Sequence, residues 1–149
     1  MIYLRDYLNE DHIVFLEETK KDEAIEKLIQ TLRDAPKMLD LDGFRKGIFK
    51  REKIMSTGIG LGIAIPHVKT PHVKDIVLAI GISRKGIPWN ALDNQPVHLV
   101  FLIGCAADQH QLYLRLLSKI ILVLKNEKRR EALGQARDAK EVIANFSSL

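Results

Sequence analysis

His67 is the residue whose type and position most clearly predict chemistry. It directly follows Ile65-Pro66 at the end of a short apolar run, so we expect its ring to project from a fixed strand end. A neutral imidazole offers a nucleophilic nitrogen near physiological pH, which is what acceptance of a phosphoryl group requires. From the local residues alone, an ordinary surface histidine is an equally good interpretation.

Three glycines at alternate positions, Gly58, Gly60 and Gly62, precede this run and raise the question of nucleotide binding. A dinucleotide-binding fingerprint needs a third glycine three residues after the second, and that pattern is broken here by Ile63. A phosphate-binding P-loop needs Gly-Lys-Ser/Thr, which this segment lacks. The glycines are therefore interpreted as positions for tight turns and close backbone packing.

The other residues with reactive side chains favour structural roles. Cys105 is the one cysteine and lies in an apolar run, which predicts a small buried side chain and a reducing compartment. His72 follows a proline in a turn, and His98 lies within an apolar strand pattern. A zinc site built from His67, His72 and His110 has no supporting carboxylates, so no metal is predicted.

Length and composition fit one domain, residues 1–149, with a single sizeable core. The net charge is +4, but basic and acidic residues are interleaved, and the densest basic stretch, residues 125–130, is interrupted by Glu127. This distribution argues against nucleic acid binding, which favours a clustered basic face with aromatics. The apolar runs fall short of the roughly 20 residues that cross a bilayer, so we expect a cytoplasmic protein without membrane insertion.

Hydrophobic periodicity divides the chain into alternating strands and helices, which predicts an α/β sandwich around one central sheet. Strands are expected over residues 13–16, 63–65, 76–83 and 97–103. Turn-forming residues at 85–90 and 93–96 separate the last two. Helices are expected over 19–35, 40–52 and 109–124, after 126 and after 138, with these N-terminal capping residues: Thr19, Asp108, Asn126 and Asp138.

Several segments resemble the fructose/mannitol-type enzyme IIA family of the bacterial phosphoenolpyruvate-dependent phosphotransferase system, which includes a nitrogen-regulatory branch. They are residues 51–52 (Arg-Glu), 56–58 (Ser-Thr-Gly), 62–67 (Gly-Ile-Ala-Ile-Pro-His), 86–93 and 96–101. The resemblance runs over nearly the whole chain. It implies a central mixed β-sheet flanked by helices on both faces.

The resemblance also implies roles for particular residues. In the family, the histidine after Ala-Ile-Pro accepts phosphate from the phosphocarrier HPr and passes it to a cysteine of a IIB partner, and His67 has that position. Arg51 corresponds to the arginine beside the phosphohistidine, where a guanidinium can hold two phosphoryl oxygens. A solvated arginine at a helix end is the alternative. Thr57 is expected to help bind the phosphoryl group, and no cofactor is implied.

The long helix departs from the family pattern His-Leu-x-x-Leu-Ser/Ala. Residues 113–118 read Tyr-Leu-Arg-Leu-Leu-Ser, so Tyr113 occupies the usual second-histidine position. His110 lies three residues earlier on nearly the same helix face. Either Tyr113 or His110 is expected to orient His67 or to bind the phosphoryl oxygens.

Three functions are compatible with these residues. The first is a phosphocarrier that takes a phosphoryl group from HPr and passes it to a IIB component in sugar uptake. The second is a stand-alone nitrogen-regulatory IIA that controls other proteins by its phosphorylation state. The third, prompted by Tyr113, is a degenerate domain that binds without accepting phosphate. In the first two, partners are expected to dock around His67, with Ile59, Leu61 and Val68 at the rim.

Overall fold

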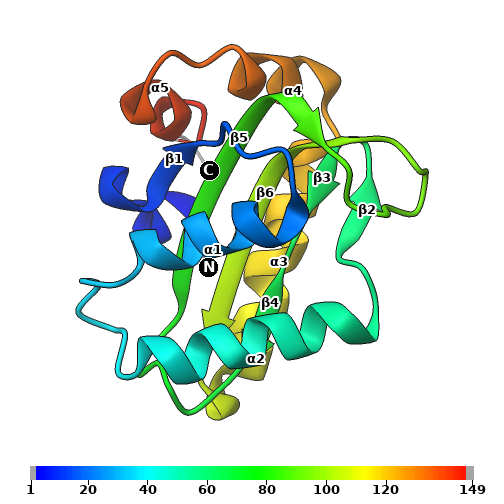
Figure 1. Cartoon of the computed structure of the whole chain (residues 1–149). Coiled ribbons are helices and arrows are strands. Elements are labelled where there is room, and N and C mark those ends of the chain that lie inside the picture. The colour runs from blue at the N-terminus through cyan, green and yellow to red at the C-terminus, as the bar shows by residue number, and fades with distance from the viewer. Residues whose placement is uncertain (1–2, 147–149) are drawn as a thin grey trace.

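A computed structural model describes residues 3–146 and shows one six-stranded mixed sheet with helices on both faces (Figure 1). The strands follow the order β1-β5-β6-β3-β2, and β4 also pairs with β6. Their bounds are β1 Ile13–Phe15, β2 Gly58–Gly60, β3 Ile63–Ala64, β4 His67–Lys69, β5 Val77–Ile87 and β6 Val97–Cys105. β5 and β6 are antiparallel, whereas β3 and β4 run parallel to β6. The predicted fold class is confirmed.

Strands β5 and β6 form the centre of the sheet and are covered on both sides. Successive side chains of a strand point to opposite faces, so each strand supplies two hydrophobic cores. Ile80 and Phe101 belong to one core, and Ala79 and Leu102 belong to the other. This double burial explains why both strands are dense in Val, Ile and Leu rather than alternating with polar residues.

Five α-helices complete the two outer layers of the described chain. α1 (Lys21–Thr31) and α2 (Leu41–Ile54) pack on one face; α3 (His110–Leu124), α4 (Glu127–Gly134) and α5 (Ala139–Ala144) lie on the other (Figure 1). Short 3-10 turns occupy Leu4–Tyr7, Glu10–His12 and Ala107–Gln109. None of the helices within residues 3–146 has the length and apolar character needed to cross a membrane.

Some predicted helix starts are confirmed by side-chain caps. Asn126 accepts the Arg129 N–H at 3.0 Å, and Asp138 accepts the Glu141 N–H at 2.9 Å. Asp40, where a helix start was expected, accepts the Gly43 N–H at 3.1 Å. These bonds satisfy backbone donors that have no partner within the helix.

Two other predicted caps are wrong. α1 begins after Lys20, one residue beyond Thr19, and no side chain caps it. Asp108 lies inside the 3-10 turn that precedes α3, so it is past the position where it could cap that turn. There the Gln109 side chain accepts the Ala106 N–H at 3.1 Å instead.

The glycine-rich segment forms more structure than the expected loop. β2 and β3 are a hairpin whose turn places Gly60, Leu61 and Gly62 at positive φ, which glycine adopts without a steric penalty. Similarly, β5 continues to Ile87 through residues that were expected to form a turn, with a register shift before Ile87. The prediction of where β5 ends is therefore wrong by several residues.

Candidate active site

His67 begins a strand of its own, whereas the sequence suggested that it follows the end of one. Pro66 has no N–H, yet its carbonyl accepts the Ile103 N–H at 2.9 Å, so the chain stays against β6. β3 and β4 thus lie one after the other along the same side of β6, with Ile63 opposite Leu99 and His67 opposite Ile103. This pairing fixes the backbone of His67.

The orientation of the His67 ring decides which nitrogen can react. Nδ1 lies 2.8 Å from the carbonyl oxygen of Ile65. Because a carbonyl oxygen only accepts hydrogen bonds, Nδ1 carries the hydrogen and Nε2 keeps a free lone pair in the neutral ring. Burial lowers the pKa of His67 below its ordinary value; the bond to Ile65 opposes this shift, and the charge of Arg51 adds to it. The ring is therefore neutral and nucleophilic at pH 7.

The lowered pKa gives a testable pH dependence. We expect the imidazole of His67 to titrate with a midpoint below 6.5, the ordinary histidine value. Protonation blocks Nε2, so the rate of phosphoryl acceptance should stay constant down to that lowered pKa and fall only below it. Proton NMR of the ring C–H signals measures the midpoint, with His67→Ala assigning the resonance. A midpoint at or above 6.5 would contradict the placement of the ring.

Close packing brings α2 onto β4 and β6. A side-chain carbon on Gly47 of α2 would lie 3.2 Å from Val68 of β4. A side-chain carbon on Gly104, which pairs with Val68 in register, would lie 2.3 Å from the buried ring of Phe44. Both glycines therefore allow the helix and the sheet to approach, which places the end of α2 beside the His67 strand.

Arg51 lies near the end of α2, where the Nη1 atom donates a hydrogen bond to the Met55 carbonyl at 2.9 Å. Burial lowers the pKa of His67 and raises that of Tyr113; the positive charge of Arg51 adds to the first shift and opposes the second, as expected for a cation near the two rings. Within residues 3–146, no carboxylate lies within 4.0 Å of this guanidinium. Its charge and remaining N–H groups are free to bind an anion.

Tyr113, rather than His110, is the α3 residue that contacts His67. The rings of Tyr113 and His67 are stacked, with centroids 5.5 Å apart and planes 30° apart. His110 lies beside Tyr113, at 6.4 Å between centroids. Burial raises the pKa of Tyr113 to about 12, so its hydroxyl keeps its proton at neutral pH. That hydroxyl donates to no other described residue and remains available as a donor.

Thr57 is buried and its hydroxyl hydrogen is already used. The carboxylate of Glu52 accepts the Thr57 N–H at 2.8 Å and the Thr57 hydroxyl at 2.6 Å. The same carboxylate forms an ion pair with Lys21 at 2.7 Å. The backbone carbonyl of Thr57 in turn accepts the N–H of Ile65, two residues before His67, at 3.0 Å. The structure thus brings Thr57 to the strand that leads to His67, as a link between α2 and that strand.

Sequence reasoning did not assign a role to Glu52 or Lys21. Glu52 is 7% exposed and joins α1, α2 and the segment that begins β2. Glu52 follows Arg51 in the family pattern, and the five residues that separate it from Thr57 are the signal in the sequence. The sequence alone does not show that a carboxylate is buried, so the hydrogen bonds of Glu52 could be identified only from the structure.

The family model described as "Phosphoenolpyruvate-dependent sugar phosphotransferase system, EIIA 2" matches residues 6–148. The chain belongs to this IIA family. The resemblance predicted from the sequence is therefore confirmed.

Two curated relatives of this IIA chain are named as fructose-specific. It is 35% identical over 132 residues to the fructose-specific EIIA component of Haloferax volcanii, which covers 87% of this chain and 86% of the relative. It is 36% identical over 128 residues to the fructose-specific EIIABC component of Bacillus subtilis, covering 86% of this chain. In that second case the IIA chain spans only 20% of the length of the relative.

Solved structures of two IIA proteins share the fold of the IIA chain. The nitrogen regulatory protein IIA-Ntr of Neisseria meningitidis superposes with a TM-score of 0.88 at 30% identity, covering 96% of this chain and 98% of that one. Mannitol enzyme IIA of Escherichia coli, solved in complex with phosphorylated mannitol enzyme IIB, superposes with a TM-score of 0.81 at 19% identity, covering 95% and 98% of the two chains. The second likeness concerns the fold alone.

His72, His98 and Cys105 of the IIA chain do not belong to a cluster of possible metal ligands. His72 lies 3.5 Å from Asp40, and the Nδ1 atom of His98 lies 2.8 Å from the Ser83 carbonyl. Cys105 is fully buried, as predicted, and burial raises the pKa of its thiol. Across residues 3–146, no three His, Cys, Asp or Glu side chains are grouped closely enough to hold a metal ion.

Exposed apolar side chains flank the site. Ile54 and Met55 follow Arg51 at the end of α2 and are 76% and 66% exposed; Leu114, next to Tyr113, is 44% exposed. Val68, expected at the rim, is half-buried and packs against the core on the α2 side of the sheet. Ile59 and Leu61, also expected at the rim, are exposed. They belong to the β2–β3 hairpin, and Ile63 of β3 pairs with β6 at Leu99, four residues before Ile103, the partner of His67.

Proposed function

We propose that this IIA chain is a phosphocarrier that accepts a phosphoryl group from an HPr-like protein on the Nε2 atom of His67. It then passes the group to a IIB component in sugar uptake. The observation that carries the proposal is the neutral His67 ring, with Nδ1 bonded to Ile65 and Nε2 free, near the unpaired charge of Arg51. The fructose-specific names of both relatives support the sugar branch.

The proposed transfer needs only the residues of this site. The Nε2 lone pair attacks the phosphorus atom in line as the bond from phosphorus to the donor histidine breaks. Positive charge that develops on the ring is stabilised by the Nδ1–H bond to the Ile65 carbonyl. Arg51 and the Tyr113 hydroxyl would share the negative charge of the phosphoryl oxygens. Thr57, held by Glu52, positions the strand that leads to His67. No metal ion or organic cofactor takes part.

Docking of both partners is expected on the apolar surface around the site, Ile54, Met55 and Leu114. Donor and acceptor would use this surface in turn, as small transient interfaces. The Escherichia coli mannitol IIA, which forms a complex with phosphorylated IIB, supports a IIB acceptor here. A cytoplasmic location suits these partners and the single buried thiol of Cys105.

A regulatory IIA is the second candidate, favoured by the likeness to the nitrogen regulatory protein of Neisseria meningitidis. Incubation with phosphoenolpyruvate, enzyme I and HPr tests the common step, because acid-labile, base-stable phosphate should appear on the chain. Absence of label would overturn both candidates and favour the degenerate domain. A chase with IIB then separates them: loss of label to a IIB cysteine indicates sugar uptake, whereas retention indicates regulation.

Arg51→Ala should slow transfer from phospho-HPr by about a hundredfold or more, because an electrostatic donor to the transferring group is lost. Arg51→Lys keeps the charge but not the planar pair of donors, so it should retain intermediate activity. Rapid-quench measurement of label on His67 gives the rates. Melting temperatures within a few degrees of wild type would show that the fold is intact. An alanine variant as fast as wild type would contradict the role of Arg51.

Tyr113→Phe isolates the contribution of the hydroxyl, because it keeps the ring that stacks on His67. We expect about a tenfold loss of transfer rate, in the range of one charge-assisted hydrogen bond. Tyr113→His should be tolerated, since a histidine at this position also offers a donor. The same rapid-quench assay measures both. A phenylalanine variant that transfers at the wild-type rate would remove the hydroxyl from the mechanism.

A further inference from the structure

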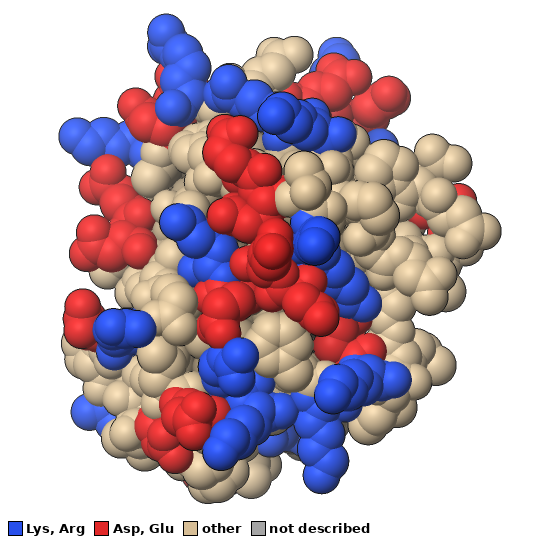
Figure 2. Space-filling model, viewed as in Figure 1, with Lys and Arg blue, Asp and Glu red and all other residues tan. Residues whose placement is uncertain are grey.

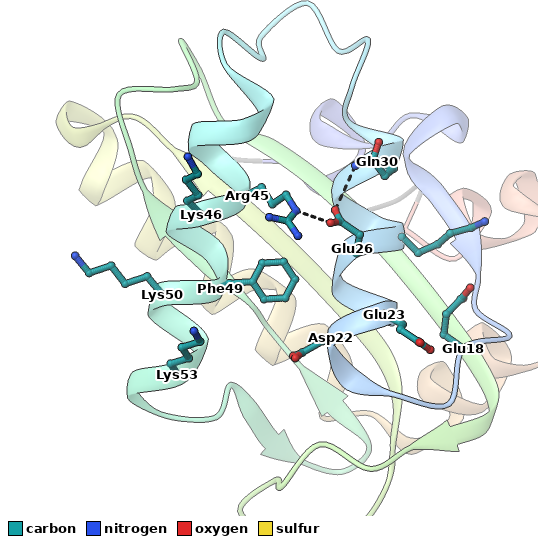
Figure 3. A pocket seen from close by; sticks show the side chains of 11 residues that line it. Glu18, Asp22, Glu23, Glu26, Gln30, Arg45, Lys46, Phe49, Lys50 and Lys53 are labelled. Atoms are coloured by element: carbon teal, nitrogen blue, oxygen red, sulfur yellow. Dashed lines mark hydrogen bonds and ion pairs between the residues drawn. The ribbon is translucent and has the colours of Figure 1, made fainter.

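Two neighbouring helices on one face of the molecule carry opposite charge. Acidic side chains gather over α1 and basic side chains over α2 (Figure 2). Between the two helices lies an open groove of about 860 Å³ (Figure 3). Its acidic wall, on the α1 side, consists of Glu18, Asp22, Glu23 and Glu26 and also contains Lys27; its basic wall, on α2, consists of Arg45, Lys46, Lys50 and Lys53.

The two walls do not neutralise each other. Among the described residues, one ion pair crosses between the walls and joins Arg45 to Glu26 (Figure 3). Lys46 is paired with Asp42 of its own helix at 3.1 Å. Within the described part of the chain, six charged lining residues have no ion pair within 4.0 Å: Glu18, Asp22, Glu23, Lys27, Lys50 and Lys53. An occupant must therefore present cations to α1 and anions to α2.

Two further observations indicate that the groove is built to be covered. One carboxylate oxygen of Glu18 is buried and has no hydrogen-bond partner, which is costly unless a cation or donor approaches. The Phe49 ring points into the groove between the two charged walls (Figure 3). Phe49 is half-buried, and an aromatic ring among charged residues is typical of the centre of a protein interface.

We propose that the occupant is a second copy of this chain. If the copy is turned by a two-fold axis that lies in the interface and runs along the groove, its α2 faces α1 of the first copy, and its α1 faces α2. Acidic and basic walls then pair twice, and Phe49 meets Phe49 near the axis. Such isologous contacts are the commonest way in which identical chains associate. The chain itself thus supplies both signs of charge on the walls that this two-fold axis brings together.

The dimer should be reversible and sensitive to salt, because its charges are exposed before association. Sedimentation equilibrium over rising protein concentration should show the mass climbing from the 16.9 kDa of one chain toward twice that value. We expect the affinity to fall at least about tenfold between low salt and about 1 M salt, where the Debye length is about 3 Å. A chain that stays monomeric at every concentration in low salt would overturn the proposal and leave the groove to another occupant.

Charge reversal of one wall gives the sharper test. Lys50→Glu with Lys53→Glu reverses two charges of the basic wall, which keeps Arg45 and Lys46, and Asp22→Lys with Glu23→Lys reverses two charges of the acidic wall, which keeps Glu18 and Glu26. Each double variant alone should be monomeric, because like charges would meet. An equimolar mixture of the two should restore dimers, which now contain one chain of each kind.

The matched control changes the same charge elsewhere. Lys125→Glu with Lys128→Glu alters two exposed lysines outside the groove by the same net charge and should dimerise as the wild type does. The proposal would be overturned if the mixture failed to associate, or if either charge-reversed double variant formed dimers by itself. The outcome is independent of phosphoryl transfer, since none of the substituted residues lies in the His67 site.

Discussion

Replacing His67 with alanine is expected to reduce phosphate uptake from phospho-HPr by at least about a thousandfold, the scale at which removal of a nucleophile acts. Nδ1 of His67 is bonded to the Ile65 carbonyl, its ring stacks on Tyr113, and the positive charge of Arg51 contributes to its lowered pKa. Labelling with radioactive phosphate from phosphoenolpyruvate, through enzyme I and HPr, measures the effect.

His110→Ala is the matched control for this loss. His110 lies 6.4 Å from Tyr113 but has no ring contact with His67, so its variant should be labelled to nearly the wild-type extent. The His67→Ala chain should also keep its folded spectrum, because the side chain is only partly buried. Equal labelling of His67→Ala and wild type would rule out His67 as the acceptor.

Replacing Glu52 with alanine is expected to cost about 3–5 kcal/mol of the free energy of unfolding. The variant would leave the Thr57 N–H and hydroxyl without their acceptor in a buried position, and it would leave the Lys21 ammonium without its partner. Urea denaturation measures the change. Because Thr57 also bonds to Ile65, phosphoryl acceptance should fall together with stability.

Glu52→Gln separates shape from charge. The amide can still accept one hydrogen bond from Thr57 but cannot pair with Lys21, so its loss of stability should lie between those of wild type and alanine. Glu17→Ala, at an exposed position, should change stability by less than about 0.5 kcal/mol. A Glu52→Ala variant within about 1 kcal/mol of wild type would show that this carboxylate does not hold the segment.

Much of the fold was predictable because burial follows hydrophobic periodicity. The long apolar runs predicted β5 and β6. The capping residues Asn126 and Asp138 predicted where α4 and α5 begin. β4 was not predictable, since three residues after a proline carry too little pattern and depend on pairing with β6. Gly86 suggested a turn; at a φ of +87° it lies in the register shift between Ile82 and Ile87, where β5 is irregular but does not end.

The site was only partly accessible from sequence. The family pattern pointed to His67 and Arg51, and the structure puts the charge of Arg51 close enough to shift the pKa of His67. The choice between Tyr113 and His110 depends on how α3 packs on the sheet, which no local pattern states. The bonds of Glu52 depend on burial in the same way, because they join segments from α1, α2 and the strand before His67.

The central claim is that the phosphoryl group is carried by one defined atom, Nε2 of His67. Heteronuclear NMR of the phosphorylated chain with isotope-labelled histidine tests it directly, because coupling of phosphorus to a ring nitrogen identifies the bonded atom. We predict phosphorus coupling at Nε2 of His67, with the Nδ1–H retained in its bond to the Ile65 carbonyl. Phosphorus bonded to Nδ1 of His67, or to any other residue, would contradict the mechanism.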